Sequence, residues 1–325
     1  MSRHYELTEP APRVHRIDSM LGGRLLSLYL VRGDREALLF DTGVRGTITD
    51  SLLPALAEVG VEPAAVRTVL VSHCDVDHFG GIEDVRAHLP SARLLAHERD
   101  RPIVEDIESF LASRGRGFAK EYGLDESAET IAWMREVGGA GRLDGVVEDG
   151  DALDLGGVTV RVHHVPGHTE GHIAVGVHDG SVLIVGDAVL GESVDLADGT
   201  PAFPPTYRYV DDYRRTIAQL ATMEPALLLT AHYPTMGSRQ ASLFLDRSRS
   251  YTTELEQIVV DELGRREGAS LDDLLEAVNP LAGSWPQEGT EGALAYPVIG
   301  HLEDLESRGI VRRSGVPGDY RWALA

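Results

Sequence analysis

Apolar and polar positions alternate in short blocks along the first part of the chain. Apolar runs at residues 25–31 and 37–40, separated by a short polar turn, predict a β-hairpin. Residues 49–59 have the spacing of a helix, and the β-branched run at 68–71 predicts a strand that leads into a histidine-rich loop. This order of strand, helix and strand is typical of layered α/β folds.

The pattern changes between residues 98 and 141 to long, charged helices with spaced apolar residues. We expect a helical insertion between two sheet-forming halves, lying as a lid over a cleft, because its apolar residues need a surface to pack against. Strand-like runs with glycine-rich turns then return and predict a second sheet with hairpin connections, at residues 146–153, 158–165, 172–177 and 182–185.

The last third of the sequence is mainly helical. Residues 213–223 predict a helix, 226–230 a strand, and a further helix is expected to end near Arg249. The remaining pattern predicts three helices and a hairpin, at residues 252–263, 271–278, 293–307, and 310–313 paired with 320–324. We therefore expect a larger domain at residues 1–248 and a winged-helix-like domain at 249–325.

The charge of the chain restricts its partners. Thirty Lys and Arg residues oppose 52 Asp and Glu residues, a formal charge of −22, which disfavours a protein that binds nucleic acid. The third helix predicted in the C-terminal domain carries Glu303, Asp304 and Glu306, which would repel phosphate. For this domain, packing or homodimer formation is therefore favoured over nucleic-acid binding.

Other compositional features indicate a soluble protein of a reducing compartment. The sequence has no run of about 18 apolar residues, as a membrane span requires, and its amino terminus lacks the apolar core of a signal peptide. The single cysteine, Cys74, cannot form an internal disulfide. We expect a cytoplasmic protein with no membrane partner, in which Cys74 packs in the interior.

Histidines and aspartates cluster where predicted strands end. Residues 71–81 read VSHCDVDHFGG and supply four candidate ligands directly after a strand, namely His73, Asp75, Asp77 and His78. Three later strands each end near another candidate: His168, Asp187 and His232. Imidazole and carboxylate groups are common ligands of catalytic metals, so this pattern predicts a metal centre.

The motif HxDxDH, followed by a distant His, an Asp and a last His, resembles that of the metallo-β-lactamase superfamily. The resemblance covers roughly residues 10–245 and includes the turn Asp41-Thr42-Gly43. It implies an αββα sandwich with two metal ions at one edge. By this resemblance, His73, Asp75 and His168 hold the first metal, Asp77, His78 and His232 hold the second, and Asp187 bridges them.

Asp75 departs from the family pattern, because most members have a histidine at this position. A third carboxylate favours harder ions, so iron or manganese becomes more plausible relative to zinc than in a histidine-rich site. Zinc also accepts carboxylate ligands and remains the first choice. Alternatively, Asp75 weakens the first site enough to leave it partly empty.

The resemblance also implies roles for individual residues. Two divalent metal ions about 3.5 to 4 Å apart lower the pKa of a bridging water and polarise a substrate carbonyl, so hydroxide is the nucleophile. Asp77 is the candidate catalytic residue that orients this hydroxide and accepts its proton, and His172 supports the site by hydrogen bonding. Tyr207 and Tyr209 are candidates for substrate contact, with simple loop packing as the equal alternative.

The favoured function is a metal-dependent hydrolase of a small carbonyl ester, of the thioester or lactone class. Asp75 motivates a second hypothesis, a di-iron oxidoreductase of the same fold. The appended C-terminal domain motivates a third, an RNA-processing nuclease, which the charge argues against. A fourth is a binding protein whose altered loop no longer supports hydrolysis. If the substrate is an anionic thioester, a cationic residue that grips it would almost have to be arginine, since Lys120 is the only lysine.

Overall fold

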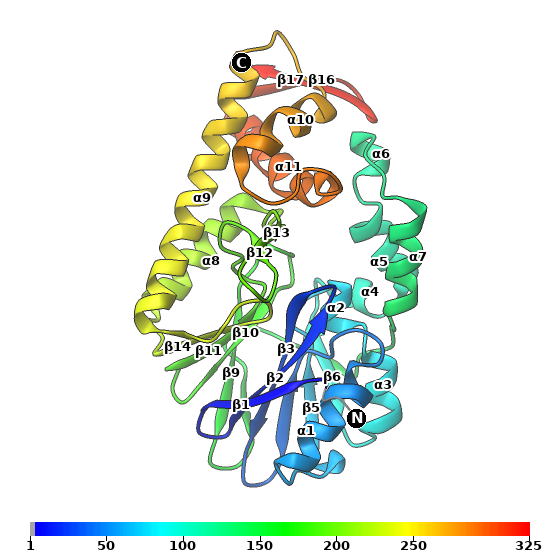
Figure 1. The fold of residues 1–325 in the computed structure, drawn as a ribbon, viewed down its shortest axis with the longest axis vertical. Coiled ribbons are helices and arrows are strands. Elements are labelled where there is room, and N and C mark those ends of the chain that lie inside the picture. Colours follow the sequence, from blue (N-terminus) through cyan, green and yellow to red (C-terminus); the bar gives the residue numbers. More distant parts are fainter. Residues whose placement is uncertain (1–3) are drawn as a thin grey trace.

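The computed structural model describes residues 4–325, in which two β-sheets pack face to face between layers of helices (Figure 1). The first sheet has seven strands in sequential order, antiparallel from β1 to β4 and parallel from β4 to β7. Its strands are β1 (Glu6–Ala11), β2 (Val14–Leu21), β3 (Arg24–Arg32), β4 (Ala37–Phe40), β5 (Val66–Leu70), β6 (Arg93–His97) and β7 (Gly145–Val147).

The second sheet has six strands in the order β15-β14-β11-β10-β9-β8, of which only β11 and β14 pair in parallel. Its strands are β8 (Ala152–Asp154), β9 (Thr159–His164), β10 (Ile173–Val177), β11 (Val182–Gly186), β14 (Leu227–Thr230) and β15 (Met236–Gly237). A small hairpin, β12 (Val194–Asp195) with β13 (Pro201–Phe203), stands apart from both sheets.

The single strand expected at residues 146–153 is wrong. The segment divides into β7 and β8, which belong to different sheets. Between them lies a polar turn in which Gly150 has φ +86°, a conformation that glycine adopts without steric cost. The chain crosses from one sheet to the other at this turn.

The burial of side chains on both faces of the central strands explains why these strands are continuous apolar runs in the sequence. On β3, Tyr29 and Val31 face the core between the sheets, whereas Leu28 and Leu30 face the outer helices. The same alternation holds on β11, so both faces of the central strands are buried. The first sheet is covered by helical segments η1 (Ile48–Leu52), α1 (Leu53–Glu58) and α3 (Ile82–His88), and the second by α8 (Val210–Thr222) and α9 (Ser238–Gly264). The αββα sandwich expected from the sequence is confirmed.

The insertion at residues 98–141 is helical, as predicted, but its helices are short. They are α4 (Arg101–Val104), α5 (Ile107–Phe110), η3 (Leu111–Gly115), α6 (Ala119–Tyr122) and α7 (Ala128–Val137). Local signals account for the breaks: Asp106 caps α5 by accepting from the backbone N–H of Glu108 and Ser109, and Gly123 ends α6 at φ +79°.

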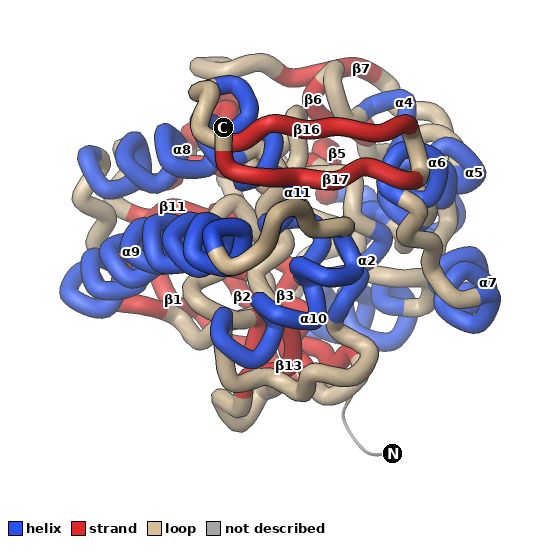
Figure 2. The backbone as a smooth tube through the Cα atoms, turned by 90° about the horizontal axis from the view of Figure 1, so that it is seen from above, coloured by secondary structure: helices blue, strands red, loops and turns tan. Residues whose placement is uncertain are grey.

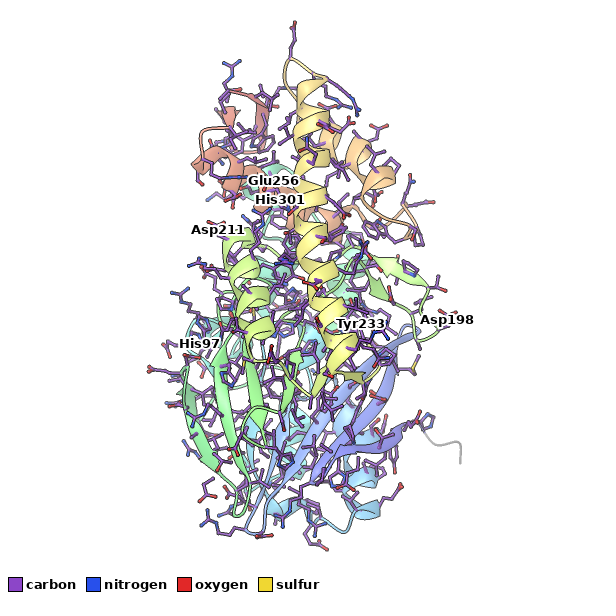
Figure 3. The ribbon with its side chains drawn as sticks, turned by 90° about the vertical axis from the view of Figure 1, so that its left-hand side faces the viewer. His97, Asp198, Asp211, Tyr233, Glu256 and His301 are labelled. Atoms are coloured by element: carbon purple, nitrogen blue, oxygen red, sulfur yellow. The ribbon has the colours of Figure 1, made fainter. Side chains whose placement is uncertain are left out.

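The two helices expected on either side of Arg249 are one continuous helix, α9, of 27 residues. Serine and threonine favour breaks because their hydroxyls compete for backbone hydrogen bonds. Here Ser248 Oγ donates to the Phe244 carbonyl (2.7 Å) and Thr252 Oγ1 donates to the Arg249 carbonyl (2.8 Å), both within the helix. These hydroxyls are satisfied without interrupting α9, which runs past the expected domain boundary (Figure 3).

The C-terminal segment follows the predicted order of elements, with α10 (Leu271–Ala282), α11 (Glu291–Ser307) and the hairpin of β16 (Val311–Val316) and β17 (Asp319–Leu324). Figure 2 looks down on this hairpin, with α11 and the strands of the sandwich beyond it. Its apolar residues share one buried cluster with the outer face of the second sheet. The likeness to a winged helix and the division into two domains stay predictions. No helix in the described part of the chain is long and apolar enough to cross a membrane.

Candidate metal centre

All seven predicted ligands meet at one edge of the sandwich. His73 follows β5, His168 lies between β9 and β10, Asp187 follows β11, and His232 follows β14. The short helix α2 (Val76–Phe79) directly after the first loop carries Asp77 and His78. Two groups of three can each surround one ion, with their ligand atoms within 4.8 Å of one another: His73, His168 and Asp187, and Asp77, His78 and His232.

Each of the four histidine ligands has one ring nitrogen held by the protein. In each of them the held nitrogen is Nδ1. That of His73 hydrogen-bonds Ser72 Oγ (2.9 Å) and that of His78 hydrogen-bonds Asp41 Oδ2 (2.8 Å). That of His168 hydrogen-bonds the Thr206 carbonyl (3.0 Å) and that of His232 the Leu25 carbonyl (2.7 Å). A carbonyl or carboxylate oxygen can only accept, so Nδ1 is the protonated nitrogen where it bonds to one. The Nε2 atoms are thereby left for the centre, the arrangement found around histidines that bind metals.

Several of these atoms lack a partner within the described chain. The Nε2 atoms of His73 and His78 and Oδ1 of Asp187 are buried and make no hydrogen bond. A buried polar atom without a partner costs about 1–3 kcal/mol, so such atoms are rare unless a ligand satisfies them. Imidazole and carboxylate donors that converge in this way fit a divalent cation.

The electrostatics of the centre show the same need for positive charge. Burial would raise the pKa of Asp187, but the neighbouring His232 and His78 hold it well below its usual range. Burial would lower the pKa of His78, but the carboxylates of Asp187 and Asp41 raise it well above its usual range. The carboxylates thus favour positive charge at His78, whereas burial and the neighbouring His78 lower the pKa of His73, and a bound cation would supply positive charge to the centre directly.

Asp75 has a second partner that the sequence did not reveal. Arg114, on η3 of the insertion, binds both carboxylate oxygens, with Nε 2.6 Å from Oδ1 and Nη2 2.7 Å from Oδ2. The same Oδ2 lies 2.9 Å from His168 Nε2 and 3.7 Å from His73 Nε2. Asp75 therefore stands between the histidines of the first group and a guanidinium that compensates its charge.

Arg114 is itself held by the C-terminal segment. Its guanidinium carbon lies 4.5 Å from the ring centre of Tyr296 on α11, a cation–π contact, and the Tyr296 hydroxyl donates to the Arg114 carbonyl (2.6 Å). The C-terminal helix, the insertion and the first ligand loop are thus joined through one residue.

Two buried aspartates position the ligand loops. Asp41 has φ +69° and accepts from Ser72 N (2.7 Å) and Ser72 Oγ (2.9 Å) as well as from His78. The sequence identified it only as part of a turn typical of the family. Asp100 was missed altogether. It lies outside the motif and accepts from Cys74 N (3.1 Å), Thr169 Oγ1 (2.6 Å) and Gly171 N (2.8 Å), linking the loops of His73 and His168.

The supporting residues lie where the sequence suggested. His172 bonds through Nε2 to the Val185 carbonyl (3.1 Å) and stacks on the His73 ring at 4.4 Å between centroids, outside both ligand groups. Cys74 is buried in the core beneath the first sheet's helices, and burial raises the pKa of its thiol. Its buried position agrees with packing rather than chemistry.

A cavity of about 200 Å³ opens over the metal centre. Its floor includes Asp77, Asp187 and His232, and its walls are largely apolar. The walls come from the insertion (Phe110, Trp133, Met134), from β13 (Phe203) and from α11 (Tyr296). The insertion and α11 therefore both contribute to the wall of this cavity, and the role of the insertion as a lid stays a prediction.

The structure does not bring Tyr207 to this cavity. Its side chain is fully buried, stacks on Tyr213 at 4.3 Å between centroids, and hydrogen-bonds His301 Nε2 (2.9 Å). Tyr209 lines a neighbouring cavity on the other side of Arg114. Of the two tyrosines, only Tyr209 lies near the site.

Comparison with known sequences identifies the class of protein. The sequence profile of the metallo-beta-lactamase superfamily matches residues 21–232, and the chain belongs to this superfamily. Its relatives include the acyl-coenzyme A thioesterase MBLAC2 of Homo sapiens, 27% identical over 237 residues that cover 67% of this chain and 76% of that protein.

A second relative is the hydroxyacylglutathione hydrolase of Aeromonas salmonicida, 27% identical over 176 residues that cover 54% of this chain. The match covers 51% of that protein, so the chain spans about half of its length. These relatives are hydrolases by name, and both names denote enzymes that act on thioesters.

Two crystal structures share the fold over nearly the whole chain. A metallo-beta-lactamase family protein from Thermus thermophilus has a TM-score of 0.75 at 23% identity, covering 97% of this chain and 99% of that one. A beta-lactamase domain protein from Burkholderia ambifaria has a TM-score of 0.72 at 20% identity, covering 98% and 94%.

Proposed function

We propose that the protein is a thioester hydrolase with a dinuclear metal centre. The observation that carries this proposal is the pair of adjacent ligand groups beneath a cavity with apolar walls. The polar floor suits a reacting carbonyl and the apolar walls suit an acyl chain. The two relatives named as thioester hydrolases support this substrate class over lactones.

For the centre we propose the ligand set that the family pattern implies. His73, Asp75 and His168 hold the first ion, and Asp77, His78 and His232 hold the second. Asp187 would serve both ions, a role supported by its membership of the first group and by its Oδ2 atom, 3.1 Å from His232 Nε2 and 3.5 Å from His78 Nε2.

When bound, two divalent cations supply a water of lowered pKa and polarise the carbonyl oxygen. Asp77 orients the attacking water and accepts its proton, since its side chain is partly exposed to the cavity while its Oδ2 lies 3.6 Å from His232 Nε2. Asp41 keeps His78 oriented, and the insertion and α11 limit the entry of bulk water. No side chain of the chain needs to be acylated.

The pairing of Asp75 with Arg114 bears on the choice of metal. A carboxylate that already shares both oxygens with a guanidinium offers less charge to a cation than a free one. The hard-ion preference expected from a third carboxylate is thereby reduced, and zinc is favoured over iron or manganese.

The test combines metal analysis and activity on one sample. Protein purified without added metal is expected to contain zinc and to hydrolyse a thioester faster than an oxygen ester, a β-lactam or a phosphodiester with matched groups. Treatment with a chelator is expected to abolish the activity, and zinc to restore it. Two iron atoms per chain with an optical band that responds to oxygen would overturn the proposal in favour of an oxidoreductase.

A further inference from the structure

The wall of the cavity contains a guanidinium without an acidic partner. Arg24, at the start of β3, lines the cavity and is half-buried, yet it forms no ion pair with any residue from 4 to 325. The other arginine of the same wall, Arg114, has both of its contacts filled by Asp75. Arg24 therefore brings an uncompensated positive charge to the cavity.

Its one strong contact within the described chain is with an aromatic ring. The guanidinium carbon of Arg24 lies 4.7 Å from the ring centre of Phe203 on β13. A cation–π contact occupies the flat face of a guanidinium and leaves the N–H donors in its plane free. Those donors match the two oxygens of a carboxylate or a phosphate. Phe203 thus orients Arg24 without satisfying it.

Arg24 is also tied to the metal centre through the backbone. The carbonyl of the next residue, Leu25, accepts the hydrogen bond from Nδ1 of His232 (2.7 Å). The start of β3 therefore positions both a ligand of the second group and the free guanidinium. An anion on Arg24 and a carbonyl at the metal centre could belong to one molecule.

The other charged groups of the cavity wall do not offer a cation to an anionic ligand. Asp77 and Asp187 face the histidine ligands. Glu126 lies against the first turn of α11, and burial together with Asp125 raises the pKa of its carboxyl. Arg24 is therefore the cationic group of this wall that is left for an anion.

The size of the cavity indicates which part of the substrate Arg24 meets. A volume of about 200 Å³ is below the range of roughly 300–1,000 Å³ that encloses a whole drug-sized ligand. An acyl group fits inside, and the rest of a larger thioester must extend out of the cavity.

We propose that Arg24 binds an anionic group, carboxylate or phosphate, on the thiol part of the substrate. The inference rests on the proposed thioesterase function and defines the substrate class as thioesters of an anionic thiol. Arg24 is a specificity-determining residue here, and Phe203 is the residue that positions it.

The experiment compares one acyl group on three thiols: N-acetylcysteamine, which is neutral, glutathione, which carries carboxylates, and coenzyme A, which carries phosphates. In the unaltered protein kcat/KM is expected to be higher for one anionic thioester than for the neutral one. In Arg24→Gln the ratio of anionic to neutral kcat/KM is expected to fall by about 10- to 100-fold, mainly through KM, as for loss of a charged hydrogen bond. Arg24→Lys should recover part of the ratio, and Phe203→Leu should lower it less.

The matched control is Arg67→Gln, which removes the same charge from an exposed position on β5 and should leave the ratio unchanged. The anionic thioester whose kcat/KM falls most in Arg24→Gln identifies the bound group, as carboxylate for the glutathione thioester or as phosphate for the coenzyme A thioester. Hydrolysis of all three thioesters without charge preference, or an equal loss on all three in Arg24→Gln, overturns the role of Arg24. Failure to hydrolyse even the neutral thioester with metal bound counts against the thioesterase function itself.

Discussion

Two polar clusters in this molecule each place a buried histidine beside a carboxylate, yet they differ in how their polar groups are paired. One is the metal centre. The other, the helix cluster, lies between α8, α9 and α11 and consists of Tyr207, Arg214, Glu256, His301 and Arg308; Figure 3 shows Glu256 and His301 side by side. In the helix cluster, Glu256 accepts from Arg214 (2.8 Å) and pairs with Arg308 (2.8 Å). In the metal centre, donor atoms converge and stay without partners in the described chain.

The difference teaches how to separate a candidate site from a structural network. Both clusters bury histidine and carboxylate groups, and both shift pKa values, so neither burial nor titration distinguishes them. In the helix cluster, His301 Nδ1 is also buried without a hydrogen bond, 3.8 Å from Glu256 Oε2. The metal centre differs because several such atoms converge there beside a cavity. Charges of the helix cluster pair with one another within the described chain, whereas the candidate metal centre keeps converging donor atoms that could hold a cation.

The largest effect that we expect comes from Asp187→Ala. Loss of the bridging carboxylate should release both metals together and lower kcat/KM by more than about 1,000-fold, several kcal/mol of transition-state stabilisation. Metal per chain and kcat/KM are measured on the same sample. Asp198→Ala, on an exposed turn, is the matched control and should keep both metals. A variant Asp187→Ala that retains two metals would show the bridge to be misassigned.

The next effect tests whether charge at the metal centre is balanced by Arg114. Arg114→Met leaves Asp75 without its guanidinium, so the metal-free protein should lose about 3 kcal/mol of unfolding free energy, the low end for a broken buried pair. Zinc should recover much of the loss, which urea unfolding with and without metal measures. The exposed pair of Arg135 and Glu108 gives the control, since Arg135→Met should cost less than about 1 kcal/mol. Equal losses with and without zinc would contradict this balance.

The smallest effect is expected in the helix cluster. The neighbouring His301, together with Arg308 and Arg214, lowers the pKa of Glu256 below its ordinary value of 4.5. Because the folded pKa is depressed, the stabilisation is present above pH 4.5 and disappears as the pH falls below it. Glu256→Gln should lower the unfolding free energy by about 1 kcal/mol at pH 7, and by progressively less towards pH 3.

Urea unfolding of the Glu256→Gln variant across this pH range checks the sign, and its metal content should equal that of the unaltered protein. A loss of metal in this variant would contradict the conclusion that the helix cluster is structural and separate from metal binding. A stability difference that grows in acid would contradict the assigned direction of the pKa.

The sequence was informative where chemistry is local. His73, Asp75, Asp77 and His78 fall within six residues after a strand, so their convergence could be read directly. The short apolar runs likewise predicted most strands of the two sheets. Arg114 could not be found in this way, because it is one arginine among many in an insertion whose folding depends on what it covers. No sequence motif or periodicity links Arg114 to Asp75, so their contact could not be predicted from the sequence.

The same limit explains the other differences. Asp100 and Glu256 act through contacts with segments far along the chain, and no periodicity marks such contacts. The interruption expected in α9 lies among hydroxyl residues, whose competition with the backbone is settled only by local geometry. The split of residues 146–153 between sheets depends on the turn at Gly150, a choice made by tertiary packing rather than by the apolar pattern.

The contact of Tyr296 with Arg114 has a consequence for how the chain can change over generations. A substitution of Tyr296 would loosen a residue that neutralises Asp75, although the two positions lie far apart in sequence. We therefore expect positions 75, 114 and 296 to vary together among descendants of this sequence. The C-terminal segment that carries Tyr296 would then be inherited as a part of the pocket, and recombination that exchanged it for another tail would remove a contact that holds the guanidinium bound to Asp75.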